Sequence, residues 1–202
     1  METCALAERG KILAAIREGA ILAYPTDTVY GIGCNALLPT PVRKVSLLKG
    51  TDHPFSVIAP SLAWVRRHLV VRHPAFLEGL PGPVTLLLEK KDPRFLRACS
   101  PGRLLGIRIP AHPIAALVRA ARVPLVTTSA NLSGQPTARS LRELPGRFRQ
   151  ADLWVDGGTL GRQASRIWDL SGGQPKEIRR KGALPLGGQR KKGKKTDLAS
   201  PA

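Results

Sequence analysis

The chain has 202 residues, of which 43% are hydrophobic, enough for a globular domain with a sizeable buried core. Lys and Arg number 32 against 14 Asp and Glu, and the formal net charge of +18 favours polyanionic partners such as nucleotides or RNA. Three cysteines without CxxC spacing argue against a zinc site and a secreted disulfide framework, and no apolar run is long enough for a signal peptide or a membrane span. We therefore expect a cytoplasmic protein with no membrane contact.

Helical and strand patterns alternate along most of the chain. In chain order they predict a helix over 4–18, a strand over 20–24, a helix over 40–49, a strand over 55–59, helices over 61–68 and from 74, strands over 84–89 and 105–109, a helix over 113–121, a strand over 124–128, a helix over 140–148, and strands over 152–156, 166–170 and 176–180. Strands that alternate with helices are typical of an α/β sheet. The helix-free spacing near 84–110 and 151–180 predicts that the sheet is mixed.

Residue chemistry supports several of these boundaries. Thr40 and Pro41 are typical of the start of a helix, Gly50 of its end, and Ser61 of a helix cap. Pro145 is expected to end or distort the helix over 140–148. From about residue 186 the sequence GGQRKKGKKTDLASPA has no apolar periodicity, so we expect one domain over 1–185 and a basic, disordered tail over 186–202.

Four stretches place hydroxyl groups, glycine or a lone basic residue at the ends of predicted elements. They are PTDTVYGIG (25–33), Lys49-Gly50, LGIRIP (105–110) and TTSANLSG (127–134). Ligands in open α/β sheets bind beyond the carboxyl ends of the strands, and small hydroxyl residues with glycine offer donors to phosphate oxygens. Each stretch also has an ordinary interpretation as a turn or a capped helix end.

Arg108 and Lys49 illustrate the same choice. Arg108 alternates with Ile107 and Ile109, so its guanidinium faces away from both, either into a crevice, where it would bind a carboxylate or phosphate, or into solvent. Lys49 occupies the last turn of a predicted helix, where a cation is favourable in any case. Ser129 lacks a GxSxG context and a recognisable partner for nucleophilic catalysis.

The order of the motifs is more informative than any one of them. YPTDTVYGIG, a helix ending in lysine, PFSVIA, PGPVTLLL, LGIRIPAHP and PLVTTSANLSG follow one another over roughly residues 5–182, and this series resembles the YrdC-like family. The resemblance implies a twisted mixed sheet with flanking helices and a deep basic cavity. It also implies L-threonylcarbamoyladenylate synthase activity, in which L-threonine, bicarbonate and ATP give threonylcarbamoyl-AMP and pyrophosphate. A partner complex would then transfer the threonylcarbamoyl group to adenosine 37 of tRNA.

The resemblance implies a role for ten residues. On the L-threonine side they are Thr26, Ala59, Arg108, Thr127 and Ser165. On the ATP side they are Lys49, Ser129, Asn131, Thr137 and Arg180. Arg108 matches the arginine that pairs with the amino-acid carboxylate, and Lys49 matches the lysine that meets the phosphates. We name no catalytic acid or base and no protein-held metal, and we expect Mg²⁺ to accompany ATP as substrate.

The sequence departs from the family pattern at the Lys-x-Arg motif and at a PST-like triplet, which here reads Ala164-Ser165-Arg166, and these departures leave alternatives open. Family members commonly have Lys-x-Arg after the second helix, whereas this chain has Lys49-Gly50-Thr51. One alternative is a paralogue of the YciO type that keeps the cavity but has weak synthase activity or none. Another is an RNA- or ribosome-binding module, favoured by the net charge and the basic tail.

Overall fold

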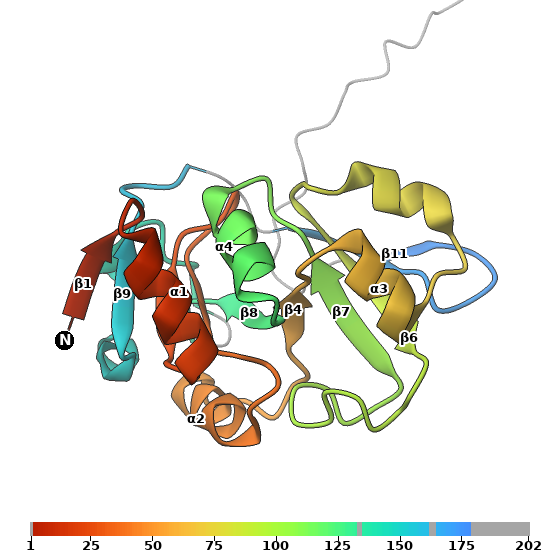
Figure 1. The fold of residues 1–202 in the computed structure, drawn as a ribbon, viewed down its shortest axis with the longest axis horizontal. Coiled ribbons are helices and arrows are strands. Elements are labelled where there is room, and N and C mark those ends of the chain that lie inside the picture. Colours follow the sequence, from red (N-terminus) through yellow and green to blue (C-terminus); the bar gives the residue numbers. More distant parts are fainter. Residues whose placement is uncertain (1, 133–134, 162–164, 179–202) are drawn as a thin grey trace, which may run out of the picture.

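The computed structural model describes residues 2–132, 135–161 and 165–178. Within these ranges eleven strands form a mixed, twisted sheet in the order β1-β9-β2-β3-β8-β4-β7-β6-β10-β11, with β5 paired to β6 (Figure 1). The strands are β1 (Glu2–Ala5), β2 (Leu22–Tyr24), β3 (Gly31–Gly33), β4 (Ser56–Ile58), β5 (Leu69–Val70), β6 (Val84–Lys90), β7 (Leu104–Arg108), β8 (Leu125–Ser129), β9 (Leu153–Asp156), β10 (Arg166–Asp169) and β11 (Lys176–Ile178). Four pairs of strands are parallel and the others antiparallel, so the predicted mixed sheet is confirmed.

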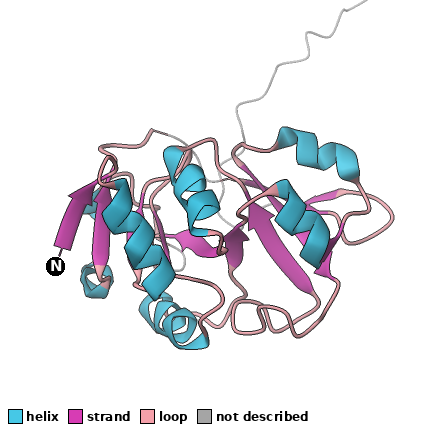
Figure 2. Cartoon of the chain, in the orientation of Figure 1, coloured by secondary structure: helices cyan, strands magenta, loops and turns pink. Residues whose placement is uncertain are grey.

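Four α-helices and three short 3₁₀ helices accompany the sheet (Figure 2). They are α1 (Arg9–Glu18), α2 (Pro39–Lys49), α3 (Leu62–His68), α4 (Pro113–Ala121), η1 (Pro74–Gly79), η2 (Leu141–Glu143) and η3 (Gly146–Gln150). Several ends follow the predicted chemistry. The Ser61 hydroxyl accepts a hydrogen bond from the amide of Trp64, and Gly50 ends α2 in the left-handed conformation. No helix within the described ranges is both long and apolar enough to cross a membrane.

The central strands are buried on both faces, as the apolar run over 20–24 predicts. Along β2, Leu22 and Tyr24 enter one hydrophobic cluster, while Ile21 and Ala23 on either side of Leu22 enter the other. Because side chains alternate along a strand, the sheet separates the two clusters. Helices α1 and α4 lie side by side over the first cluster (Figure 1).

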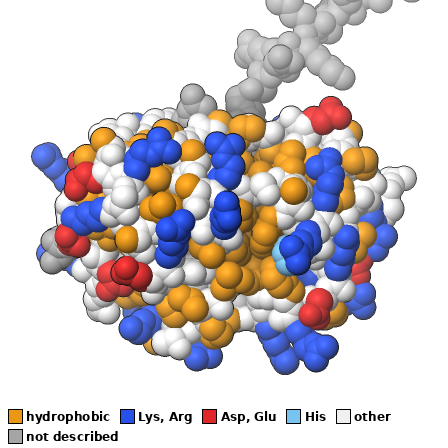
Figure 3. Space-filling model, in the orientation of Figure 1, with side chains coloured by type: hydrophobic (Ala, Val, Ile, Leu, Met, Phe, Trp, Pro, Cys, Tyr) orange, Lys and Arg blue, Asp and Glu red, His pale blue; other side chains and the backbone are white. Residues whose placement is uncertain are grey.

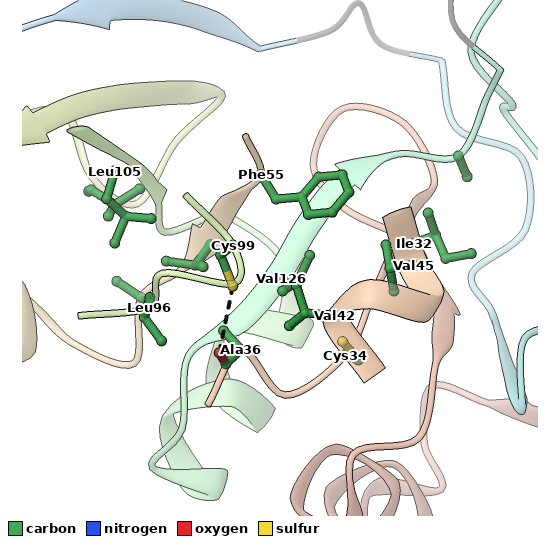
Figure 4. Packing of buried hydrophobic residues seen from close by; sticks show 14 of the residues in the cluster. Ile32, Cys34, Ala36, Val42, Val45, Phe55, Leu96, Cys99, Leu105 and Val126 are labelled. Atoms are coloured by element: carbon green, nitrogen blue, oxygen red, sulfur yellow. Dashed lines mark hydrogen bonds between the residues drawn. The ribbon is translucent and has the colours of Figure 1, made fainter. Parts of the chain in front are cut away.

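The second cluster contains apolar side chains of α2 together with those of the central strands. Figure 4 shows Val42 and Val45 of α2 near Ile32 and Val126, with Phe55 across from them. Cys99 joins this cluster and donates a hydrogen bond from its thiol to the Ala36 carbonyl, at 3.6 Å. All three cysteines are buried and free. This larger cluster includes Tyr30, which also lines the polar site described below.

Three predicted elements are wrong in their details. The helix over 4–18 starts only at Arg9, because residues 2–5 form β1 and pair in parallel with β9, a distant contact that overrides local helix preference. The helix over 140–148 is two 3₁₀ turns, and between them Leu144 is extended, as the residue before Pro145 prefers to be. Helix α2 begins at Pro39 with Leu38 as its cap residue, two positions before the predicted first residue Pro41 and cap Thr40, because Pro39 suits the first helical position as well as Pro41 does.

Candidate functional site

A polar hollow of about 380 Å³, including its open mouth, lies where β3, β7 and β8 meet the loop after β2. Hydroxyl side chains and one guanidinium dominate its lining. The lining residues are Thr26, Thr28, Val29, Tyr30, Gly31, Ser56, Thr85, Arg108, Thr127, Thr128, Ser129 and Ser165. Five residues that were predicted from three separate stretches of sequence and from one position near residue 165 therefore share one cavity: Thr26, Arg108, Thr127, Ser129 and Ser165.

The stretch PTDTVYGIG forms both a turn and a wall of the hollow. The buried Thr26 hydroxyl donates to the carbonyl of Val29 at 2.8 Å and accepts from the amide of Thr28 at 3.2 Å. These bonds fold the chain back so that it leaves as β3, antiparallel to β2. The turn interpretation and the ligand-loop interpretation are therefore compatible, since Thr26 makes the turn and lines the cavity at once.

Glycine at the end of this stretch allows a close approach of two strands. A Cβ atom on Gly33 would lie 1.7 Å from the carbonyl oxygen of Val126, so no larger residue fits without moving β8. That same carbonyl accepts the hydroxyl of the fully buried Tyr24 at 2.9 Å. Gly31–Gly33 forms the strand β3, which the sequence did not predict and which joins β2 to β8.

Arg108 is held in the hollow by Asp27. Its guanidinium, 8% exposed, forms an ion pair through Nη2 with Oδ1 of Asp27, whose side chain is 4% exposed. Both terminal nitrogens also lie 3.4 Å from the Thr28 hydroxyl, a long hydrogen bond, while the buried Nε has no partner among the described residues. Burial lowers the pKa of the Arg108 guanidinium, and the Asp27 carboxylate opposes that shift. Of the two predicted environments for Arg108, the structure shows the crevice.

Lys49 fixes the loop that follows β8. It is 8% exposed, and its Nζ donates to the carbonyl oxygens of Ser129 at 2.8 Å and of Asn131 at 2.5 Å. The Asn131 side-chain oxygen lies 3.3 Å from Nζ and accepts the Ser129 hydroxyl at 2.6 Å. Lys49 does not line the hollow itself, but through these bonds it sets the position of Ser129, which does.

The other predicted residues take different places. Ser165 and Thr85 share a buried hydrogen bond of 3.0 Å between their hydroxyls on the wall of the hollow. Ala59 is buried in the larger apolar cluster, and its amide donates to the carbonyl of Arg108 at 2.9 Å. Thr137 is half-buried and precedes Ala138, whose carbonyl accepts the amide of Tyr30. Arg180 lies outside the described residues.

Further polar residues at this site have no role predicted from the sequence, among them Asp27, Thr28, Ser56, Thr85 and Thr128. Two of them, Asp27 and Thr28, stand inside the quoted stretch. Thr85 is in PGPVT, where alternation along β6 places it opposite its apolar neighbour Leu86. A polar residue at a buried strand position can indicate a site residue, but its role is recognisable only once its hydrogen-bond partner, here Ser165, is known.

The arrangement can bind an oxyanion and neutral hydroxyl-bearing groups. A guanidinium with unpaired N–H groups in a buried setting binds carboxylate or phosphate strongly, because little water competes. Threonine and serine hydroxyls can donate or accept, so they suit a ligand that carries both functions. Within the described ranges no group of three or more His, Cys, Asp or Glu side chains could hold a metal ion.

A twisted mixed sheet with a buried cationic, hydroxyl-lined hollow defines a class of α/β ligand-binding proteins. The Sua5/YciO/YrdC family model, described as "Telomere recombination", matches residues 14–182. The chain belongs to this family, which confirms the resemblance and the fold that it implied.

Relatives and solved structures agree with that membership. The chain is 38% identical over 173 residues to a human protein named Threonylcarbamoyl-AMP synthase, an alignment that covers 79% of this chain and 61% of the relative. It is 36% identical over 178 residues to the protein of that name from Xanthomonas axonopodis pv. citri (strain 306), covering 81% and 94%. A structure of P. abyssi Sua5 complexed with L-threonine matches with a TM-score of 0.78 and 28% identity, covering 88% and 56%. The chain thus spans about three fifths of the length of its mammalian relatives.

Proposed function

We propose that this chain is an L-threonylcarbamoyladenylate synthase. The observation that carries the proposal is the convergence of Thr26, Arg108, Thr127, Ser129 and Ser165 on one buried hollow. The names of relatives at 36–38% identity, and the L-threonine complex of P. abyssi Sua5, support it further. The substrates would be L-threonine, bicarbonate and ATP, and the products threonylcarbamoyl-AMP, pyrophosphate and water.

The reaction requires positioning and charge neutralisation. The threonine amine attacks bicarbonate or CO₂ to give a carbamate, and a carbamate oxygen then attacks the α-phosphorus of ATP as pyrophosphate leaves. No step needs a covalent bond to the protein, so a site of hydroxyls and cations suffices. The described residues provide no carboxylate-rich ligand set for Mg²⁺, and we propose that it arrives bound to the triphosphate.

Each residue takes a part that fits its surroundings. Arg108 binds the threonine carboxylate through its unpaired N–H groups, and the wall hydroxyls of Thr26 and Ser165 meet the rest of the amino acid. Lys49 holds the Ser129–Asn131 loop in place for the nucleotide and adds positive charge beside it. Thr137 and Arg180 remain predicted contacts on the nucleotide side.

The experiment is pyrophosphate release by the purified protein with ATP and Mg²⁺. We expect release only when L-threonine and bicarbonate are both present. At L-threonine concentrations below KM, Arg108→Ala should release far less pyrophosphate than wild type. Arg103→Ala should not, because Arg103 directly precedes β7 but is exposed and pairs with Glu89. Release that ignores threonine, or no release from folded protein, would count against the proposal.

The missing arginine of Lys-x-Arg does not leave this region without a cation. Gly50 ends α2, and Nη1 of Arg147 on η3 lies 2.9 Å from the place where a Gly50 Cβ would be. We propose that Arg147 provides positive charge at the end of α2, and that the chain is therefore a synthase rather than a YciO-type paralogue with weak synthase activity or none. Introducing the family residue through Thr51→Arg tests this alternative. A large rise in activity would support the paralogue interpretation, and little change would support ours.

RNA binding is a second candidate, favoured by the charge. Lys and Arg side chains are spread over the face shown in Figure 3, with few acidic side chains among them. We propose that the chain binds structured RNA, such as the tRNA that accepts the threonylcarbamoyl group, with an affinity that falls steeply as the salt concentration rises. The predicted tail over 186–202 lies outside the described residues, and its deletion should weaken RNA binding while leaving pyrophosphate release intact. Cytoplasmic location and a tRNA-modifying partner complex belong to the same proposal.

A further inference from the structure

Asp27 lies behind the hollow rather than on its wall. It belongs to the loop between β2 and β3, and its buried side chain is absent from the lining that Arg108 shares with the wall hydroxyls. Its Oδ1 accepts from Nη2 of Arg108, and its Oδ2 accepts the backbone amide of Ala111 at 2.9 Å. One carboxylate therefore joins the ligand loop, the end of β7 and the turn before α4.

The two carboxylate oxygens of Asp27 bind different groups, and this determines which N–H groups of Arg108 remain for a ligand. A carboxylate that faced the guanidinium with both oxygens would occupy two parallel N–H groups. Asp27 cannot do so while Oδ2 holds Ala111. It takes one terminal nitrogen and leaves Nε without a partner among the described residues. The guanidinium is thus fixed in place. Because Arg108 lines the hollow and Asp27 accepts from Nη2 alone, the other terminal N–H groups are donors for a second oxyanion.

A fixed guanidinium matters because an arginine side chain is long and has many rotamers. Without a partner, the buried cation of Arg108 would be uncompensated and would turn toward water or another acceptor. The Thr28 hydroxyl, 3.4 Å from both terminal nitrogens, is too far to hold it alone. The strong contact among those described is Asp27.

We infer that Asp27 is the positioning residue for Arg108, which it holds so that the unpaired N–H groups face an α-amino-acid carboxylate in the hollow. The identity of that ligand rests on the proposed function, whereas the positioning does not. Because Arg108 would bind the carboxylate equally before and during the reaction, loss of Asp27 should weaken binding of the amino acid more than turnover.

The test compares Asp27→Asn with wild type. The amide keeps the shape and one acceptor oxygen but removes the charge. We expect the KM for L-threonine to rise about tenfold to a hundredfold, the loss typical of a charge-assisted hydrogen bond, with kcat and the KM for ATP nearly unchanged. Asp27→Glu, which restores the carboxylate, should recover part of this affinity. The control is Asp152→Asn, which removes another carboxylate that accepts a backbone amide, from Ile21, and should change neither constant.

A second measurement needs no substrate. The Nε–Hε NMR resonance of Arg108, assigned with Arg108→Lys, should be sharp and slow to exchange in wild type and Asp152→Asn. It should broaden or exchange rapidly in Asp27→Asn and to a lesser degree in Asp27→Glu, which is compared with wild type if the asparagine variant does not fold. An unchanged resonance together with an unchanged or lower KM overturns the inference. A wild-type protein that does not use threonine overturns the proposed function instead, and the resonance alone then decides the role of Asp27.

Discussion

Replacing each of two buried lysines by methionine separates the stability of the fold from the activity of the site. Lys90, 2% exposed, donates from Nζ to the carbonyl oxygens of Pro93 at 2.8 Å, Phe95 at 3.1 Å and Ser100 at 2.8 Å. Burial lowers the pKa of its ammonium. Lys49 makes a similar set of bonds to the Ser129–Asn131 loop. The two side chains are thus matched in burial and bonding, but only one adjoins the hollow.

The cost of each substitution can be worked from these contacts. A hydrogen bond to a charged group contributes about 1.5–3 kcal/mol, and methionine leaves three carbonyl or amide oxygens without their donor. Relief from burying the ammonium offsets part of that loss. We therefore expect Lys90→Met and Lys49→Met each to lower the free energy of unfolding by about 3 kcal/mol. For a domain of this size that lowers Tm by about 6–12 °C.

The assay combines thermal denaturation with pyrophosphate release, both on the same preparations. Activity is measured below the melting transition of either variant. Lys90→Met should then retain nearly wild-type turnover, whereas Lys49→Met should lose most of it. If Lys90→Met is inactive while folded, or Lys49→Met is active, then Lys49 has no special part in the site and the reasoning fails.

Three further predictions concern the scaffold. Gly33→Ala places a Cβ atom against the Val126 carbonyl and should lower Tm sharply or prevent folding. Gly10→Ala has no atom within 4 Å of its Cβ position and should leave Tm unchanged or raise it. Thermal denaturation followed by circular dichroism measures both. Burial, together with Arg67 and Lys91, lowers the pKa of His68 below its ordinary value, so the unfolded chain binds the proton first and the free energy of unfolding should fall as pH drops below about 6.5. In denaturant titrations at several pH values, the free energy of unfolding of His68→Gln should depend less on pH than that of wild type. An identical pH dependence would show that His68 is not the responsible group. Burial raises the pKa of the Cys99 thiol to about 12 and that of the other two cysteines as well, so a thiol reagent at neutral pH should label the chain only after unfolding.

Local chemistry predicted much of the fold because many boundaries depend on single residues. Ser61 caps α3, Gly50 ends α2, and His112 caps α4 by accepting the amide of Ile114. The strand β1 could not be predicted in this way, because its stability comes from pairing with β9, some 150 residues away. The strand β3 has a glycine-rich sequence that disfavours strands, and it forms because glycine permits close contact with β8.

The sequence predicted part of the membership of the candidate site but not its bonding. The order of motifs indicated that Thr26, Arg108 and Ser129 belong together, and they line one hollow. The partner of Arg108 depends on the orientation of a side chain 81 positions away, which no periodicity encodes. The carbonyl partners of Lys49 were likewise hidden, because backbone oxygens are common to every residue.

Among the described residues, the two outermost strands of the sheet, β1 and β11, lie at opposite ends of the molecule (Figure 1). Each is short and carries charge, with Glu2 paired to Lys11 at one end and Glu177 paired to Arg166 at the other. The outer edge of such a strand has unpaired backbone groups to which a strand of another molecule could add. That addition would bury the charged side chains, which makes it unfavourable. We therefore expect these charged residues to disfavour edge-to-edge aggregation at high protein concentration, and apolar replacements there to promote it.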